Sequence, residues 1–276
     1  MNNRAGQLAA ASDLVDIDAL LRAYSDLHPD VSNPEQKVVF GTSAHRGSSL
    51  TASFNDDHIA AITQAIVEYR AGQNIRGPIY VGKDTHALSG PAEITALEVL
   101  AANDVVALVE CNDGYTPTPA VSLAIIDHNR GKSNSDSSRA DGLVITPSHN
   151  PPADGGFKYN PPHGGPADSD ATNWIATRAN EIIAGGLREV KRAKPQGVGF
   201  DFRENYISKL EQVINLRAIS NAGVKIGADP MGGAAVAYWG EIGERFNLDL
   251  TVVNPNVDFQ FAFMSLDWDE KIRMDC

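Results

Sequence analysis

Residues 141–165, DGLVITPSHNPPADGGFKYNPPHGG, contain a group of side chains capable of chemistry. A hydroxyl, an imidazole and an amine follow one another at Ser148, His149 and Lys158. A serine with such neighbours can act as a nucleophile or carry a phosphoryl group. The apolar residues 142–145 predict a buried strand that ends just before Ser148. We therefore expect Ser148 beyond the carboxyl end of a strand, where open α/β sheets bind their ligands.

The composition of the loop after this strand predicts a rigid backbone around Ser148. Pro147, Pro151 and Pro152 restrict the backbone. Gly155 and Gly156 predict a sharp bend, because glycine adopts conformations that other residues avoid. Lys158 then follows in the same loop.

A second polar segment, residues 41–49, follows a predicted strand at 37–40 and carries Arg46. The planar guanidinium of arginine suits phosphate or carboxylate oxygens. From these residues alone, a phosphate contact and a solvent-exposed turn are equally good interpretations. Lys83, Asp84 and His86 lie at or just beyond the carboxyl end of another predicted strand, and we expect them to organise the neighbouring loop.

Strand and helix patterns alternate along the chain and predict an α/β fold, with a mixed, mostly parallel sheet sandwiched by helices. Expected strands span residues 78–84, 105–110, 142–145, 224–228 and 248–253, and expected helices span residues 13–27, 55–71, 89–103, 117–128, 171–184, 202–214 and 234–246. We expect an N-terminal helical extension at 1–39, a first domain at 40–197 and an incomplete second domain of the same kind at 198–276.

The composition of the 276 residues disfavours several classes of function. A net charge of −12 argues against binding to nucleic acid, whose phosphates attract basic surfaces. No apolar run is long enough for a membrane span, and the N-terminus lacks a signal-peptide pattern. Cys111 and Cys276 have no spacing typical of a disulfide framework or zinc site, and Cys111 is expected to be buried. The cytoplasm is the expected compartment.

Several motifs in the chain together resemble the α-D-phosphohexomutases. Residues 146–151, TPSHNP, resemble the active-site serine motif of that family, and residues 155–160, GGFKYN, resemble the segment that accompanies it. Further motifs follow the family's order at residues 41–47 (GTSAHRG), 81–86 (VGKDTH), 116–120 (TPTPA) and 229–233 (DPMGG). The likeness is greatest to the bacterial members specific for glucose phosphates, and it involves their N-terminal part only.

This resemblance implies that Ser148 is phosphorylated and exchanges its phosphoryl group with a small-molecule hexose phosphate. Glucose 1-phosphate and glucose 6-phosphate would interconvert through bound glucose 1,6-bisphosphate. It also implies Mg²⁺ bound to a phosphoryl oxygen on Ser148. Arg46 and Lys158 would bind phosphate, with Lys158 also a candidate for proton transfer. His149 would act as an acid/base partner or hold the loop by a hydrogen bond.

Two departures from the family pattern bear on this interpretation. Ala44 stands where the family has glycine, which predicts backbone strain if that position needs a positive φ. The family's metal-binding DxDxDR motif is absent, and residues 267–269, DWD, resemble it only superficially. We therefore expect the chain to be the first half of a mutase.

Two alternatives remain open from the sequence. The chain could be a catalytically inactive fragment that at most binds a phosphosugar or a protein partner. It could also be a serine-phosphate hydrolase, which fits the Ser148 loop but not the order of the motifs. The sequence gives no indication of the oligomeric state.

Overall fold

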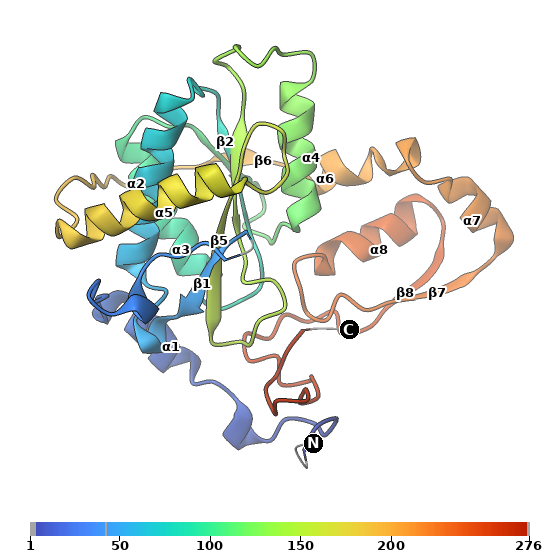
Figure 1. Ribbon diagram of the computed structural model, residues 1–276. Coiled ribbons are helices and arrows are strands. Elements are labelled where there is room, and N and C mark those ends of the chain that lie inside the picture. Colours follow the sequence, from blue (N-terminus) through green and yellow to red (C-terminus); the bar gives the residue numbers. More distant parts are fainter. Residues whose placement is uncertain (1–3, 42, 275–276) are drawn as a thin grey trace.

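The computed structural model describes residues 4–41 and 43–274, so Thr42 and Cys276 lie outside the described residues. Its main sheet has six strands in the order β1-β5-β4-β2-β3-β6 (Figure 1). The strands are β1 (His45–Ser48), β2 (Ile79–Lys83), β3 (Ala107–Glu110), β4 (Asp141–Ile145), β5 (Asp154–Asn160) and β6 (Val198–Phe200). β5 runs antiparallel to both of its neighbours, and the pairs β4–β2, β2–β3 and β3–β6 are parallel. The expected mixed, mostly parallel sheet is confirmed.

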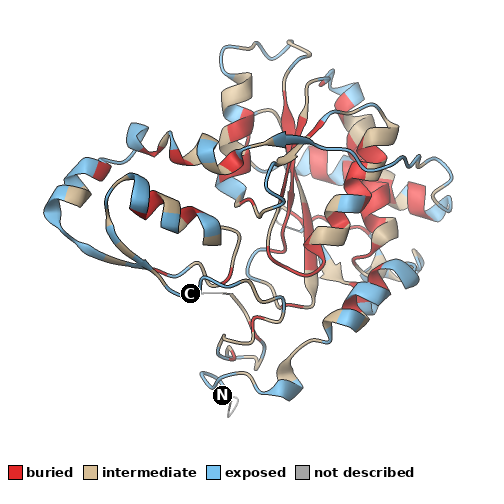
Figure 2. Ribbon diagram, turned by 180° about the vertical axis from the view of Figure 1, so that it is seen from behind, coloured by how far each residue is buried: buried red, intermediate tan, exposed pale blue. Residues whose placement is uncertain are grey.

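Helices cover both faces of this sheet. The α-helices of the described residues are α1 (Ile17–Asp26), α2 (Asp56–Gly72), α3 (Ser89–Ala102), α4 (Thr118–Asn129), α5 (Ser169–Ala184), α6 (Phe202–Ile207), α7 (Leu216–Ala222) and α8 (Val236–Arg245). Side chains of α2, α3 and α5 pack on one face with Leu143 and Ile145. Those of α4 and α6 pack on the other with Tyr80 and Val144. Figure 2 shows that the buried residues concentrate along the strands and on the inner sides of these helices.

Local sequence explains where several helices begin. Asp168 precedes α5, and its carboxylate accepts a hydrogen bond of 2.9 Å from the Ala171 N–H. This satisfies one of the N–H groups that have no partner within the helix. Asp56 and Asp57 occupy the first turn of α2, where negative charge complements the helix dipole. Pro119 lies in the first turn of α4, where the missing N–H costs little.

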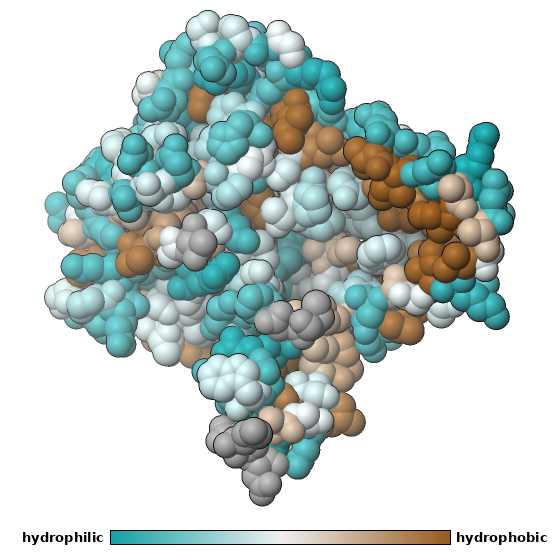
Figure 3. Space-filling model, turned by 45° about the vertical axis from the view of Figure 1, so that its right-hand side comes forward, coloured by the Kyte–Doolittle hydropathy of each residue, from teal (hydrophilic) through white to brown (hydrophobic). Residues whose placement is uncertain are grey.

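A smaller unit follows the main sheet. β7 (Lys225–Ala228) and β8 (Asp249–Val252) pair in parallel, and α8 connects them, as the sequence predicts. Two strands leave much apolar surface uncovered. A groove of about 400 Å³ is lined mainly by apolar side chains of this unit and of residues 206–219, among them Leu210, Ile219, Ile226, Tyr238, Trp239 and Leu250. Figure 3 shows hydrophobic side chains gathered on this side of the molecule.

Beyond β8 the chain returns to the edge of the main sheet. Residues 255–274 contain no helix or long strand and lie beside the N-terminal segment (Figure 1). The Leu266 N–H donates to the carbonyl of Gln7, and the Gly6 N–H donates to the carbonyl of Leu266, both at 2.8 Å. Phe261, Leu266 and Ile272 form a small apolar cluster there. In the part of the chain that the structure describes, no helix combines the length and apolar character needed to cross a membrane.

Two predictions of secondary structure are wrong. Residues 37–40 do not form a strand, because the backbone N–H and C=O of Val38 pair with the side chain of Asn180 instead. The helix predicted at 202–214 ends at Ile207, and a 3₁₀ turn follows at Leu210–Gln212. β6 pairs with β3, so the main sheet includes residues 198–200.

His45 in β1 makes the fold sensitive to acid. Its ring is buried against Phe54 and His58, and burial lowers the pKa of His45 to about 3. The unfolded chain therefore binds a proton at this site between about pH 6.5 and pH 3, whereas the folded chain does not. As the pH is lowered through this window, the free energy of unfolding should fall by up to about 1.4 kcal/mol per pH unit.

We predict that His45→Phe makes this decline shallower, measured by urea unfolding at several pH values. His163→Gln, at an exposed histidine, is the matched control and should keep the wild-type slope. Equal slopes for His45→Phe and the wild type would contradict the assignment.

Candidate functional site

Ser148 lies in the loop between β4 and β5, at the carboxyl end of β4, as predicted. Its side chain is exposed, and its N–H donates to the Thr146 hydroxyl at 2.9 Å. Its φ of +70° places it in the left-handed region, which costs a residue with a Cβ roughly 1–2 kcal/mol. Strain of this kind is typical of functional loops that the surrounding structure holds in place.

The two glycines after this loop do not form the predicted bend. Gly155 and Gly156 lie inside β5, where they allow close approach of other groups. A Cβ on Gly156 would lie 2.2 Å from the carbonyl oxygen of Thr146 and 2.5 Å from the Cα of Pro147. A Cβ on Gly155 would lie 2.3 Å from the ring of Phe54. Glycine is required here so that β5 can pass directly beside the Ser148 loop.

Lys158 and Arg46 both lie on strands, not in the loops predicted for them. Lys158 in β5 pairs with Val144, and Arg46 in β1 pairs with Gly156. Because alternate residues share a face, both cations project from the same face of the sheet. Neither side chain makes a hydrogen bond or ion pair with another residue in the described ranges. Burial and the nearby charge of Arg46 lower the pKa of Lys158.

His149 is exposed beside Ser148. Its backbone carbonyl accepts a hydrogen bond of 3.3 Å from the N–H of Met274, in the C-terminal segment. Its imidazole has no hydrogen-bond partner among residues 4–41 and 43–274. The contact that holds the loop here therefore comes from the backbone of His149 and not from its ring.

The expected role of Asp84 and His86 agrees with their contacts. His86 is buried; its Nδ1 lies 2.9 Å from an Asp84 carboxylate oxygen and its Nε2 lies 3.0 Å from the carbonyl of Asn150. Burial alone lowers the pKa of His86, but the Asp84 carboxylate outweighs it and raises the pKa overall. A protonated ring donates to both partners at once. Asp84, which also accepts from the Ser89 hydroxyl at 2.6 Å, thereby anchors the Ser148 loop.

Ser148 opens onto a cavity of about 260 Å³. Its walls come from five parts of the chain: the end of β4, the end of β2, residues 116–118 at the start of α4, residues 230–235 before α8, and the C-terminal segment at Phe261 and Met274. The ring of Phe261 lies 5.3 Å from that of His86, measured between centroids. No local sequence pattern predicts Phe261 or Met274 at the site, because both lie more than 100 residues from Ser148 in the sequence.

Ala44 introduces no backbone strain. It is buried and is not among the described residues with positive φ. The strain predicted from its replacement of glycine is therefore absent.

The described residues do not provide a magnesium site at Ser148. Mg²⁺ prefers carboxylate, phosphate and water oxygens. Within residues 4–41 and 43–274, the one group of three potential ligands is Glu110, Cys111 and Asp201, which includes a thiol and lies outside the Ser148 cavity. Cys111 is also exposed, contrary to our expectation.

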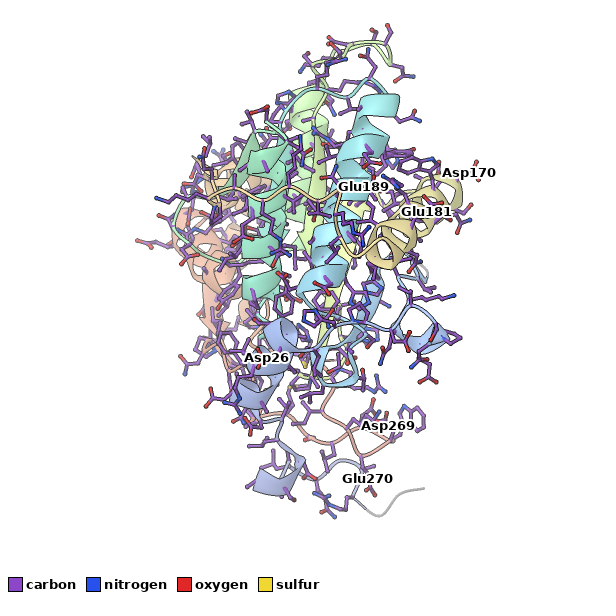
Figure 4. All side chains as sticks on the ribbon, turned by 90° about the vertical axis from the view of Figure 1, so that its left-hand side faces the viewer. Asp26, Asp170, Glu181, Glu189, Asp269 and Glu270 are labelled. Carbon is purple, nitrogen blue, oxygen red and sulfur yellow. The ribbon has the colours of Figure 1, made fainter. Side chains whose placement is uncertain are left out.

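The carboxylates of residues 267–269 are engaged with a cation. Arg273 donates to Asp269 at 2.5 Å and lies 3.8 Å from Asp267. Figure 4 shows Asp269 and Glu270 on the C-terminal segment, beyond the end of the sheet. This pairing argues against a metal role for the DWD sequence.

Gly156→Ala tests the contact between β5 and the Ser148 loop. Because the added Cβ would meet backbone atoms, the loop must shift, and we predict a loss of about 1–3 kcal/mol in the free energy of unfolding. Gly90→Ala, in α3 with open space around it, is the matched control and should not destabilise the protein. Chemical denaturation measures both. Equal stability of Gly156→Ala and the wild type would show that the loop tolerates the contact.

Comparisons with known proteins identify the family. Residues 37–185, more than half of the chain, match the family model for phosphoglucomutase/phosphomannomutase, alpha/beta/alpha domain I. A phosphoglucomutase of Komagataeibacter xylinus is 51% identical over 279 aligned residues, which cover 99% of this chain and 50% of the relative. A cytoplasmic phosphoglucomutase of Mesembryanthemum crystallinum is 31% identical, over 59% of this chain and 31% of the relative. The chain thus spans half or less of the length of these relatives.

A solved structure has the same fold. The phosphoglucomutase parafusin from Paramecium superposes with a TM-score of 0.66 at 19% identity, over 87% of this chain and 46% of that protein. The family model matches more than half of the chain, and the Komagataeibacter relative is 51% identical over 99% of it. The chain therefore belongs to the phosphoglucomutase/phosphomannomutase family.

Proposed function

We propose that this protein takes part in a phosphoglucomutase reaction, interconverting glucose 1-phosphate and glucose 6-phosphate through a phosphorylated Ser148 and bound glucose 1,6-bisphosphate. The observation that carries the proposal is the position of Ser148. It is an exposed, strained serine that opens onto a cavity, beside a strand that carries Lys158. The family match to domain I and the similarity to a bacterial phosphoglucomutase support it.

The proposed transfer needs a carrier, a proton acceptor and positive charge. A hydroxyl oxygen of the sugar phosphate forms a bond to the phosphorus as the bond from phosphorus to the Ser148 oxygen breaks. The hydroxyl proton passes to the Lys158 amine, whose lowered pKa increases its neutral fraction. Lys158 then gives this proton to the departing Ser148 oxygen, so that Ser148 regains its hydroxyl. The second half of the reaction runs in reverse, from the other phosphate of the bisphosphate back to Ser148.

Arg46 supplies fixed positive charge. A phosphoserine and a sugar phosphate together carry roughly −3 to −4, since each phosphate contributes about −1.5 to −2 near neutral pH. Catalysis of phosphoryl transfer consists largely of positioning and neutralising this charge. The resemblance also implies Mg²⁺, but the described residues do not form a site for it, so these steps rely on Arg46 and Lys158 alone.

A second candidate function is binding of a phosphosugar without turnover. The lack of a carboxylate set around Ser148 in the described part of the chain favours it, because less charge is then neutralised during transfer. The two candidates differ in one measurable property. A mutase converts glucose 1-phosphate to glucose 6-phosphate, whereas a binding module only binds it.

Removal of the Ser148 hydroxyl tests the carrier. On incubation with ³²P-labelled glucose 1,6-bisphosphate, we predict that the wild-type protein becomes labelled and that Ser148→Ala and Ser148→Gly show only background label. Ser133→Ala, in an exposed loop, is the control and should label normally. Label on Ser148→Ala, or none on the wild type, would refute the phosphoserine. A parallel assay of glucose 6-phosphate formation separates the two candidate functions.

The lowered pKa of Lys158 predicts a pH dependence. The neutral amine accumulates as pH rises through the lowered pKa, so the transfer rate should rise with pH and reach half its maximum below 10.5, the ordinary value for lysine. Arg46→Gln removes a charge that lowers this pKa and should move the midpoint upward. A midpoint unchanged in Arg46→Gln would contradict the coupling.

Lys158 should also destabilise the protein. Because its folded pKa is below its unfolded pKa, the free energy of unfolding rises with pH between the two values. Lys158→Met should therefore be more stable than the wild type at pH 7 and should lose transfer activity. Thermal unfolding measures the stability. A melting temperature of Lys158→Met below that of the wild type would contradict the destabilising effect of the charged amine.

A further inference from the structure

Ser148 keeps a left-handed backbone conformation, with a φ of +70°, that residues with a Cβ normally avoid. Such strain persists only where neighbouring groups fix the backbone. The Ser148 N–H donates to the hydroxyl of Thr146, two residues earlier in the chain, at 2.9 Å. The position of the Thr146 hydroxyl therefore bears directly on the conformation of Ser148.

The Thr146 side chain is buried and has a second partner. Its exposed fraction is 7%, and its hydroxyl also forms a hydrogen bond with the carboxylate of Asp84. A hydroxyl can donate one hydrogen bond while it accepts another. Because an ionised carboxylate only accepts, Thr146 donates to Asp84 and accepts from the Ser148 N–H. One hydroxyl thus connects a carboxylate at the end of β2 to the backbone of the serine.

Asp84 is itself held by several donors. Its carboxylate accepts from the backbone N–H of His86 at 3.0 Å and from the Ser89 hydroxyl at 2.6 Å, and it lies 2.9 Å from the imidazole Nδ1. Burial raises the pKa of Asp84, but the charge of His86 and the hydrogen bonds to the carboxylate outweigh burial and lower the pKa overall. Asp84 is therefore ionised near neutral pH, and a charged acceptor binds the Thr146 hydroxyl more strongly than a neutral one.

The Asp84–His86 pair holds the chain on both sides of Ser148. Through the carboxylate it binds Thr146, two residues before the serine. Through the imidazole Nε2 it binds the carbonyl of Asn150, two residues after the serine, at 3.0 Å. The Ser148 side chain remains exposed between these two fixed points. The loop is therefore fixed from the buried side, while the hydroxyl of the serine stays accessible.

We propose that Thr146 is a positioning residue for Ser148: its hydroxyl links Asp84 to the Ser148 N–H and keeps the serine in the conformation that faces the cavity. The consequence for the reaction rests on the proposed function, because a misplaced serine oxygen exchanges phosphoryl groups more slowly. Thr146 acts through the backbone of Ser148 and needs no contact with the sugar phosphate. Its removal therefore lowers the rate of transfer and leaves the affinity for substrate unchanged.

Two substitutions separate the hydroxyl of Thr146 from its shape. Thr146→Val removes the hydroxyl and keeps a branched side chain, whereas Thr146→Ser keeps the hydroxyl and loses a methyl group. A role in packing alone would make Thr146→Ser the more damaging change, and a role of the hydroxyl makes it Thr146→Val. Thr63→Val is the matched control, because Thr63 in α2 is also buried and its hydroxyl has no partner among the described residues.

Hydrogen–deuterium exchange, followed by mass spectrometry, measures the hold on the loop independently of any activity. A peptide of residues 146–152 reports mainly on the N–H groups of residues 148–150, because residues 147, 151 and 152 are prolines. We expect exchange about tenfold faster in Thr146→Val, which corresponds to the loss of one hydrogen bond. Thr146→Ser and Thr63→Val should exchange like the wild type. Wild-type exchange in Thr146→Val, or equally fast exchange in Thr146→Ser, would overturn the inference.

Labelling with ³²P from glucose 1,6-bisphosphate measures the effect on transfer. At saturating bisphosphate, we expect Thr146→Val to label about tenfold more slowly than the wild type, with the half-saturating concentration unchanged. Thr146→Ser should restore the wild-type rate. A raised half-saturating concentration with an unchanged maximal rate would assign Thr146 to substrate binding and would overturn its role in positioning.

The two measurements keep this inference separate from the proposed function. Faster exchange in Thr146→Val with no label on the wild-type protein supports Thr146 as the residue that positions Ser148, and it refutes the phosphoserine. Normal label on the wild type with unchanged exchange in Thr146→Val supports the phosphoserine and overturns the role of Thr146.

Discussion

The close contact between β5 and the backbone of residues 146–147 is the constraint on which the candidate site depends. It is possible because Gly156 has no side chain to separate the two segments. The contact lets an antiparallel strand return directly beside the serine loop, so that Lys158 and, through β1, Arg46 share one face of the sheet. If β5 lay farther from residues 146–147, Lys158 and Arg46 would both lie elsewhere.

Two separate parts of the chain build the site. One holds the Ser148 loop in place, and the other lines the opposite side of the cavity. Below Ser148, the buried pair of Asp84 and His86 fixes the loop through the carbonyl of Asn150. Opposite, the smaller unit contributes the start of α8, and the C-terminal segment contributes Phe261. The proposed phosphate chemistry is compatible with an acidic protein, because close cations such as Arg46 and Lys158 can outweigh a distant net charge.

Much of this arrangement could be predicted from local sequence. The apolar residues 142–145 followed by TPS predicted both the strand and the position of Ser148 at its end. The error at Gly155 and Gly156 arose because glycine favours bends locally, whereas here its small size permits pairing with β1 and β4. Likewise, residues 37–40 have strand-like composition, but Asn180 occupies the backbone groups of Val38. Contacts of this kind depend on residues that lie far away in the sequence, so no local pattern reveals them.

The apolar groove beside β7 and β8 has a consequence for how copies of the protein behave together in solution. Copies carrying a net charge of −12 repel one another, while uncovered apolar surface favours their association. Dissolved salt limits the reach of the repulsion to about 8–10 Å at physiological strength and leaves the apolar attraction intact. Acid near the pI of about 4.9 removes the repulsion altogether. Ionic strength and acidity thus set the colloidal stability of this protein, and acidity also lowers the stability of its fold through His45.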